Sequence, residues 1–302
     1  MCSILSWKGD LPKGLLSALL IEAESRGKDS TGIAFREEGH NVVYRQAVSA
    51  HYFVKTNNKH CGEARRSKTG IGHTRRASKG MPINNINAHP FIFGKYIFAH
   101  NGKIDNWQDL KIGLINKYAE AAKNTEVAAE KTSAEKMAQF YRGIMTDSMV
   151  LGEYISSRDF SPVMGCMGLA WINRDNVYCF RSNKELVGAV VTWKEKEENS
   201  TAKEVHNLAL VASTRKIISE AINHVKGVEF DYDFVDLDEN TIYRLEVNKI
   251  VAEGTVPVNP ANHEDQFTSA EVVSGTPVST PVSTPVSIPV TQELEKYGCY
   301  LL

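Results

Sequence analysis

The chain opens with MCSILSW (residues 1–7), which places Cys2 directly behind the initiator Met1. Removal of Met1 would leave one residue with both a thiol and a free α-amine. The thiolate is the reactive form of cysteine, and an α-amine with a pKa of about 7.7–8.0 can accept the thiol proton directly or through one water. Cys2 is therefore a candidate nucleophile that carries its own base. The alternative is that position 2 favours small residues for processing reasons, because a lone cysteine is a weak motif.

Residues 3–7 have the pattern of a short buried strand, and residues 13–24 carry apolar side chains at helical spacing. Further strand and helix patterns are grouped along the chain rather than strictly alternating, which favours α+β layering over a parallel doubly wound sheet. The expected strands are residues 32–35, 41–44, 71–74, 96–100, 168–172, 177–181, 187–192, 208–213 and 241–247, and the expected helices are 107–118, 125–141, 147–157 and 214–224.

The composition indicates a globular protein with a sizeable core, because the 302 residues are 42% hydrophobic and 24% charged. The formal net charge of −1 gives no electrostatic footprint for nucleic acid or an anionic membrane surface. Five scattered cysteines without a Cys-x-x-Cys pair argue against a disulfide framework and against a zinc site. We find no signal-peptide pattern and no apolar run of about 18 residues, so we expect a cytoplasmic protein without a membrane span.

The composition changes abruptly after about residue 258. Residues 274–290 read SGTPVSTPVSTPVSIPV, a pattern that favours polyproline II and cannot form a core. We therefore expect one domain over residues 1–258, followed over residues 259–302 by a disordered linker rich in Pro, Ser, Thr and Val and by a short C-terminal tail. The last four residues, from Cys299 to Leu302, match the Cys-a-a-X prenylation pattern; a fortuitous match and a partner-docking peptide are the alternatives.

Two segments place arginines near the ends of predicted elements. Arg26 begins RGKDSTG (residues 26–32), between the first helix and a strand, where a turn and strand entry explain the segment equally well. Arg75 lies in GHTRRAS (residues 72–78) at the end of a strand pattern. Its planar guanidinium suits a carboxylate, and a solvated basic turn is the alternative.

Two further segments carry an amide and a carboxylate. Asn101 and Gly102 follow an apolar strand, and Asn-Gly in that place predicts a hairpin turn. The same dipeptide can offer a side-chain amide and an unshielded backbone N–H, the two donors that an oxyanion hole requires. Asp147 opens an apolar helix, where a carboxylate stabilises unpaired amides, and a substrate ammonium is a second use for it.

Together these segments resemble the class II glutamine amidotransferase domain, an N-terminal-nucleophile (Ntn) hydrolase. The order of the motifs is the specific part of the resemblance. An N-terminal cysteine, RGKDSTGIA, GHTRRAS, NAHPF (residues 87–91), HNG with a following Asn106, and TDSMVL (residues 146–151) occur in the family's sequence order. Weaker matches continue to about Thr255.

The resemblance implies a four-layer αββα sandwich with two antiparallel sheets and with Cys2 at the end of a central strand. It implies that Cys2 attacks the side-chain amide of free L-glutamine, forms a γ-glutamyl thioester and releases ammonia, without a metal or another cofactor. Asn101 and the Gly102 N–H would stabilise the tetrahedral oxyanion.

The resemblance also assigns the substrate-binding groups. Arg75 would hold the α-carboxylate of glutamine and Asp147 its α-ammonium. Ser78 would contact the main-chain end of the substrate, and Arg26 would support the loop of the nucleophile.

The sequence departs from the family pattern in three places. Arg76 stands where the family usually has an aromatic residue, and Lys79 where a histidine is frequent. The segment from about residue 107 to 145 is longer than usual and rich in Ala, Glu and Lys, which suggests an added helical pair that serves as a lid or a docking surface. Because no synthase domain follows, we expect a standalone domain that supplies ammonia to a separate synthase partner.

Two other functions stay open at this stage. One is a catalytically silent binding or scaffold protein that kept the fold. The other is an N-terminal-cysteine hydrolase that acts on another γ-glutamyl amide.

Overall fold

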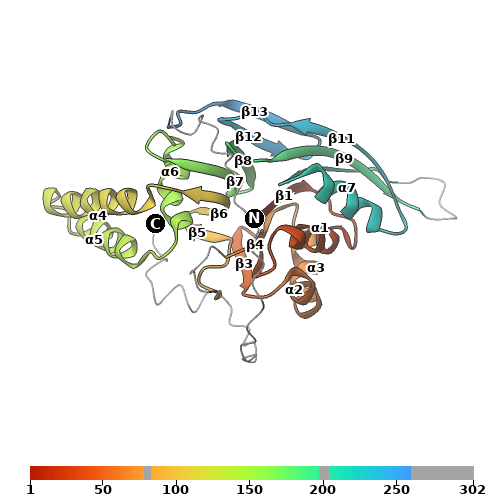
Figure 1. The fold of residues 1–302 in the computed structure, drawn as a ribbon, viewed down its shortest axis with the longest axis horizontal. Helices are drawn as coiled ribbons and strands as arrows, with labels where there is room; N and C mark the ends of the chain where they lie inside the picture. Colours follow the sequence, from red (N-terminus) through yellow and green to blue (C-terminus); the bar gives the residue numbers. More distant parts are fainter. Residues whose placement is uncertain (78–82, 197–203, 260–302) are drawn as a thin grey trace, which may run out of the picture.

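Two antiparallel β-sheets stack face to face in the computed structural model, which describes residues 1–77, 83–196 and 204–259 (Figure 1). One sheet has seven strands, in the order β11 (Val228–Asp236), β9 (Val187–Glu195), β10 (His206–Ala212), β1 (Ser3–Gly9), β4 (Thr69–Arg75), β2 (Ser30–Glu37) and β3 (His40–Gln46). The other has six strands, in the order β13 (Lys249–Thr255), β12 (Thr241–Glu246), β8 (Asn176–Ser182), β7 (Gly165–Asn173), β6 (Tyr96–Ile104) and β5 (Phe91–Phe93).

Helices cover the outer face of each sheet (Figure 1). The seven-stranded sheet packs against α1 (Leu15–Ala23), α2 (Ala50–Thr56), α3 (Asn58–Arg66) and α7 (Arg215–His224). The six-stranded sheet packs against α4 (Trp107–Asn124), α5 (Ala128–Gly143) and α6 (Leu151–Ser157). Two short 3₁₀ helices, η1 (Glu24–Arg26) and η2 (Asp147–Val150), precede β2 and α6. The α+β class and the four-layer αββα arrangement are therefore confirmed.

Strand β1 lies in the middle of the seven-stranded sheet and is buried on both faces. Leu5 and Trp7 pack with the helices on the outer face, whereas Ile4 packs between the two sheets with residues such as Ile97. Successive side chains of a strand point to opposite faces, so burial of both faces explains the continuous apolar run that follows Cys2. A central strand paired on both sides is a rigid base for the residue at its start.

Several elements were absent from the sequence-based expectations, namely β5, β11, β13, α2 and α3. The hairpin turn expected at Asn101 and Gly102 is wrong, because β6 continues through both residues to Ile104 and pairs with β7 over its whole length. Gly102 permits this continuation. Its φ is +153°, and a Cβ at this position would lie 1.9 Å from the carbonyl oxygen of Cys166 on β7.

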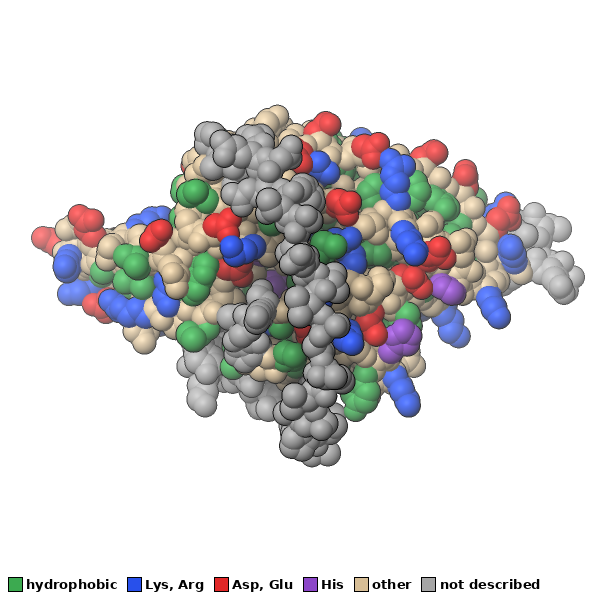
Figure 2. Space-filling model, in the orientation of Figure 1, with side chains coloured by type: hydrophobic (Ala, Val, Ile, Leu, Met, Phe, Trp, Pro, Cys, Tyr) green, Lys and Arg blue, Asp and Glu red, His purple; other side chains and the backbone are tan. Residues whose placement is uncertain are grey.

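The outer surface carries mixed charge. On the face shown in Figure 2, basic and acidic side chains are interspersed rather than segregated. Within the residues that the structure describes, no helix combines the length and apolar character that crossing a bilayer requires. Ser78, the Pro-rich segment and the tail with Cys299 lie outside the described residues.

Candidate active site

Cys2 lies immediately before β1, at the edge where this strand meets β4 and β10. The register pairs Ser3 with Thr74 of β4 and Leu5 with Ala212 of β10. The backbone N–H of Arg76, just beyond the end of β4, points at the Cys2 sulfur with an N–S distance of 3.3 Å. The sulfur is therefore held by the main chain of the neighbouring strand. Met1 is 64% exposed, whereas Cys2 is partly buried.

The surroundings of Cys2 have opposing effects on its ionisation. Burial raises the pKa of the Cys2 thiol, and the Arg76 N–H, the N-terminal amine, Arg75 and Lys184 act in the opposite direction. Burial also lowers the pKa of the N-terminal amine carried by Met1. A thiol with a raised pKa stays protonated near neutrality and needs a base to become nucleophilic. The amine with the lowered pKa belongs to Met1, so the hypothesis that the α-amine of Cys2 is this base stays a prediction.

Arg26 contacts the backbone of Cys2. Its Nε donates to the Cys2 carbonyl oxygen at 3.2 Å, and its Nη1 pairs with Glu185 at 3.4 Å. The Glu185 side chain is 72% exposed, so this ion pair contributes little to stability. The geometry thus places Arg26 against the carbonyl of the nucleophile's own residue.

The segment after Arg26 holds the end of β4 in place. The Asp29 N–H donates to the Arg75 carbonyl at 2.9 Å, and the Asp29 carboxylate accepts from the N–H of Ala77 at 2.8 Å. Gly27 packs directly on this backbone, since a Cβ on it would lie 2.5 Å from the carbonyl carbon of Arg75. These contacts fix the chain on both sides of Arg76.

Arg75 ends β4 with a side chain that is only 7% exposed. Its Nη1 has no hydrogen-bond partner among the described residues. A buried guanidinium N–H without an acceptor is energetically costly, so this group is poised to accept an anionic ligand. A planar guanidinium binds a carboxylate through two parallel hydrogen bonds.

Asn101 is connected to β1 through one serine. Asn101 is 2% exposed, and its Nδ2 donates to the Ser213 hydroxyl at 3.4 Å. The same hydroxyl accepts from the backbone N–H of Ile4 at 2.9 Å. The amide of β6 is therefore linked to the strand that starts behind Cys2. Gly102 follows in β6, where it pairs with Met167 of β7.

Asp147 begins η2 and contacts the end of β6, three residues beyond Asn101 at Ile104. One of its carboxylate oxygens accepts from the Ile104 N–H at 3.0 Å and the other from the Ser148 N–H at 2.8 Å. The Asp147 carboxylate therefore accepts a hydrogen bond from a backbone N–H in the first turn of η2, as expected for a carboxylate at the start of a helix. A carboxylate has about four acceptor sites, so it retains capacity for a substrate ammonium.

Buried histidines adjoin the Asn101–Gly102 pair, and the sequence analysis gave them no role. His73 Nε2 lies 3.1 Å from the carbonyl oxygen of His100, and His100 Nδ1 lies 2.9 Å from the Ser148 hydroxyl. The ring centroids of His73 and His89 are 4.3 Å apart. Burial lowers the pKa of His73 to about 3 and also lowers the pKa values of His89 and His100, so the three rings are neutral near pH 7.

Ser213 and Lys184 were also missed as site residues. Ser213 had two sequence signals: its position between a strand and a helix, and the weak match of Ala212 and Ser213 to the family pattern. The stem of Lys184 passes near Gly168, the residue that pairs with Asn101: a Cβ on Gly168 would lie 3.6 Å from the Lys184 Cγ. No sequence pattern relates Lys184 to Cys2.

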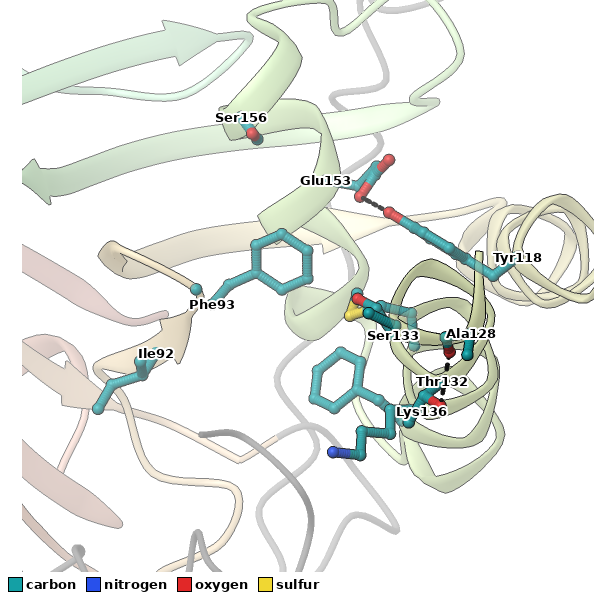
Figure 3. Close-up of a pocket in the computed structure, with 13 residues that line it drawn as sticks. Ile92, Phe93, Tyr118, Ala128, Thr132, Ser133, Lys136, Glu153 and Ser156 are labelled. Carbon is teal, nitrogen blue, oxygen red and sulfur yellow. Dashed lines mark hydrogen bonds between the residues drawn. The ribbon is translucent and has the colours of Figure 1, made fainter. Parts of the chain in front are cut away.

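A cavity of about 660 Å³ lies elsewhere, between β5, α5 and α6 (Figure 3). Phe93 lines it from β5 and Tyr118 from α4, and the Tyr118 hydroxyl donates to Glu153 at 2.8 Å. None of the residues that contact Cys2 lines this cavity. It is separate from the candidate active site.

The chain has sequence relatives among known aminotransferases. No protein-family model matches the chain. The glutamine–fructose-6-phosphate aminotransferase of Aquifex aeolicus is 33% identical over 153 residues, covering 50% of this chain and 25% of that protein. The corresponding enzyme of Shouchella clausii is 29% identical over 179 residues, covering 58% of this chain and 28% of that protein. The chain thus spans only 25–28% of the length of these two curated relatives.

A solved structure shares the fold. The glutamine phosphoribosylpyrophosphate amidotransferase of B. subtilis, in complex with ADP and GMP, superposes with a TM-score of 0.52 at 15% identity, covering 83% of this chain and 49% of that one. The likeness concerns the fold, and in the present chain Cys2 directly precedes a central strand of one of the two stacked antiparallel sheets. The chain is thus similar in sequence, over about half of its length, to glutamine–fructose-6-phosphate aminotransferases, and similar in fold to a glutamine amidotransferase.

Proposed function

We propose that the chain hydrolyses the side-chain amide of free L-glutamine to glutamate and ammonia, with Cys2 as the nucleophile. The observation that supports the proposal is that β1, which starts directly after Cys2, pairs with β4, which ends at Arg75, and is linked through the Ser213 hydroxyl to Asn101 of β6. Each of these side chains supplies a different function that amide hydrolysis needs.

The first half of the reaction breaks the C–N bond of the amide. After Met1 is removed, the α-amine of Cys2 takes the thiol proton, and the sulfur attacks the amide carbon. The negative charge that develops on the oxygen is stabilised by the Asn101 amide and the Gly102 N–H. Collapse of this intermediate breaks the C–N bond, and the proton held by the α-amine passes to the leaving nitrogen, which departs as ammonia.

The second half of the reaction hydrolyses the γ-glutamyl thioester. The α-amine of Cys2 accepts a proton from water, whose oxygen attacks the thioester carbon. The C–S bond then breaks, glutamate leaves and the thiol regains its proton. Cys2 returns to its starting state, so the cycle consumes only glutamine and water.

Arg75 is proposed to bind the α-carboxylate of glutamine and Asp147 its α-ammonium, with Ser78 near the same end of the substrate. The unpartnered Nη1 of the buried Arg75 supports the first assignment. The unused acceptor capacity of Asp147 supports the second. These contacts would favour the free amino acid over a glutamine within a protein, whose α-amine and α-carboxyl are in peptide bonds.

A separate synthase is proposed to accept the ammonia. The curated relatives are aminotransferases several times longer than the matched segment, which supports an acceptor site outside these residues. Helices α4 and α5 extend from one end of the sheets (Figure 1). Ile112 of α4 and Val127, which directly precedes α5, are exposed apolar residues. We propose this pair as the docking element. The assignment is tested by purifying the chain from its native host and comparing the proteins that co-purify with the parent and with a variant in which both residues are replaced by alanine.

The surplus of positive charge near Cys2 favours one second candidate, a γ-glutamyl amide that bears an additional carboxylate. Arg76 and Lys184 both act on the ionisation of groups at the site, and neither has an acidic partner within 4.0 Å among the described residues. Comparison of kcat/KM for glutamine and γ-glutamylglycine separates the two substrates.

The direct test is glutamate release from glutamine by purified protein whose intact mass shows the loss of Met1. The parent is expected to release glutamate and ammonia in equal amounts, and Cys2→Ala to release neither. Equal release by parent and variant would refute the proposal. If neither protein releases glutamate, although both are folded and Met1 is absent, the silent scaffold is favoured.

A further inference from the structure

Ser213 joins the two sheets at the candidate active site. It lies between the end of β10 and the start of α7, and it is completely buried. Its backbone N–H donates to the carbonyl of Ile4 at 3.1 Å, and its hydroxyl accepts from the N–H of Ile4 at 2.9 Å. The same oxygen accepts from Asn101 Nδ2 at 3.4 Å. One side chain thus contacts the strand behind the nucleophile and the amide proposed for the oxyanion.

The hydroxyl replaces an acceptor that the sheet would normally supply. In an antiparallel ladder, two residues that form a hydrogen-bonded pair exchange both of their N–H and C=O groups. Ser213 gives its N–H to Ile4 but accepts from Ile4 through Oγ instead of its carbonyl. The chain leaves the sheet at this point, because Thr214 caps α7. Use of the hydroxyl as the acceptor in place of the backbone carbonyl brings the Ser213 Oγ to the side on which Asn101 lies.

Both lone pairs of the Ser213 hydroxyl are used by these two contacts. The Asn101 amide has two N–H groups, so one contacts Ser213 and the other remains for a ligand. Without an acceptor at Oγ, no other side-chain hydrogen bond of Asn101 within the described residues would keep its nitrogen, rather than its oxygen, on this side. An amide turned by 180° would present a carbonyl oxygen to a developing oxyanion and repel it.

We infer that Ser213 is a positioning residue that orients the Asn101 amide as an oxyanion donor and fixes its distance from the Cys2 strand. The inference rests on the proposed function, because it assigns a role within the same hydrolysis. Ser213 does not touch the substrate in this account. It acts through Asn101, so its removal should slow the chemical step more than it weakens glutamine binding.

The main variant is Ser213→Ala, which removes the hydroxyl alone. Loss of one oxyanion donor typically lowers kcat about 10²–10³-fold. In Ser213→Ala the Asn101 amide is still present but free to rotate, so we expect a smaller decrease in kcat, about 10–100-fold. KM for glutamine should stay within about threefold, because Arg75 and Asp147 still bind the substrate. Ser6→Ala is the matched control: Ser6 lies on β1, is 1% exposed, and its hydroxyl has no hydrogen-bond partner in the described part of the chain. This control should keep the parent kcat.

Two measurements separate positioning from general damage to the site. Alkylation of Cys2 by iodoacetamide, mapped on the N-terminal peptide, needs no oxyanion hole and should proceed at the parent rate in Ser213→Ala. In an Asn101→Ala background, Ser213→Ala should lower kcat by less than about threefold further, because residues that act through one another are not additive. If Ser213→Ala does not fold, the near-isosteric Ser213→Cys takes its place in the kinetic tests, since a thiol is a weak acceptor.

The outcomes are distinguishable. A selective loss of kcat, with parent-like alkylation and non-additivity with Asn101→Ala, supports the inference. Parent-like kcat in an active background overturns it and leaves the proposed function intact. Equal losses in kcat and alkylation, or full additivity, also overturn it, because they indicate a structural role. If the parent itself releases no glutamate, the proposed function fails and this inference fails with it.

Discussion

The Nε atom of Arg26 donates to the carbonyl oxygen of Cys2 at 3.2 Å, which ties the end of η1 to the residue that carries the nucleophile. The contact joins positions 24 residues apart in the sequence. It is made by a charged donor in a partly buried place, and hydrogen bonds of this kind contribute about 1.5–3 kcal/mol. The position of the Cys2 backbone therefore depends on a side chain outside its own strand.

Replacement of Arg26 is expected to slow glutamine hydrolysis. Arg26→Gln removes the charged donor, so we expect kcat to fall about tenfold or more, as a loss of about 1.5 kcal/mol implies. Arg158→Gln is the control for loss of a surface ion pair, since Arg158 pairs with Glu253 at 2.9 Å and does not contact Cys2. Steady-state kinetics with glutamine measure the effect. Equal kcat values for the two variants would contradict this role of Arg26.

Gly102 is expected to be irreplaceable even by alanine. A Cβ at this position would meet the Cys166 carbonyl at 1.9 Å, and a φ of +153° is unfavourable for any side chain. Gly102→Ala should therefore reduce the free energy of unfolding by about 1–3 kcal/mol or more. Gly113→Ala is the opposite case, because Gly113 lies exposed in α4 with nothing within 4 Å of its added Cβ, and it should stabilise by about 0.5–1 kcal/mol. Urea unfolding of both variants checks the pair; a Gly102→Ala protein as stable as the parent would count against the close approach of β6 and β7.

The buried histidines are expected to make the fold sensitive to acid. The folded-state pKa of His73 is about 3, below its ordinary value of 6.5, so the unfolded chain binds more protons between these two values. The stability that the neutral ring confers is complete above about pH 6.5 and is lost progressively as the pH falls toward about 3. His89 and His100 act in the same direction.

His73→Asn should weaken this dependence, because asparagine has amide donors and does not titrate. Urea unfolding of parent and variant at several values between about pH 4 and 8 measures the slope. The variant need not match the parent's stability at pH 7; only the slope is compared. An unchanged slope would show that His73 is not buried as a neutral group.

The Cys2 thiol of a chain that retains Met1 is expected to react slowly at neutral pH. Burial raises its pKa above the ordinary value of 9.0, so little thiolate forms near pH 7. The rate of iodoacetamide alkylation should keep rising beyond about pH 9. The Met1-free chain, with an adjacent amine as base, should react faster between about pH 7 and 8. Peptide mapping assigns the label, and a rate that levels off below about pH 8 in the Met1-retaining chain would contradict the raised pKa.

Much of the fold was predictable from hydrophobic patterns. Burial of both faces of β1 gives its continuous apolar run, and period-3.6 patterns predicted α7 and the α4–α5 segment. Strand β11 was missed although it alternates, because Glu229, Asp231 and Asp233 on its exposed face mask a half-buried strand in a search for apolar runs. Helices α2 and α3 are too short, at seven and nine residues, for a clear helical period.

Of the candidate site, only the residues that lie within a recognisable sequence motif could be predicted. Motif order led to Cys2, Arg75 and Asn101, which lie on or next to β1, β4 and β6, and their catalytic and binding roles stay predictions. The contact between Ser213 and Ile4 spans 209 positions and leaves no local pattern. The expected turn at Asn101 was wrong for a related reason, because the strand continuation at Gly102 depends on how closely Cys166 of β7 approaches, and that distance is set by the sheet.

Trapping the acyl-enzyme tests directly whether Cys2 is the nucleophile and forms a γ-glutamyl thioester. Met1-free protein is mixed with glutamine, quenched in acid within the first turnovers, digested and analysed by mass spectrometry. We predict one glutamyl group on the N-terminal peptide, attached to Cys2, and no label in Cys2→Ala. The labelled fraction should increase when hydrolysis of the thioester is slowed. Glutamate release by the parent with no label on this peptide, or a label on another residue, would contradict the account.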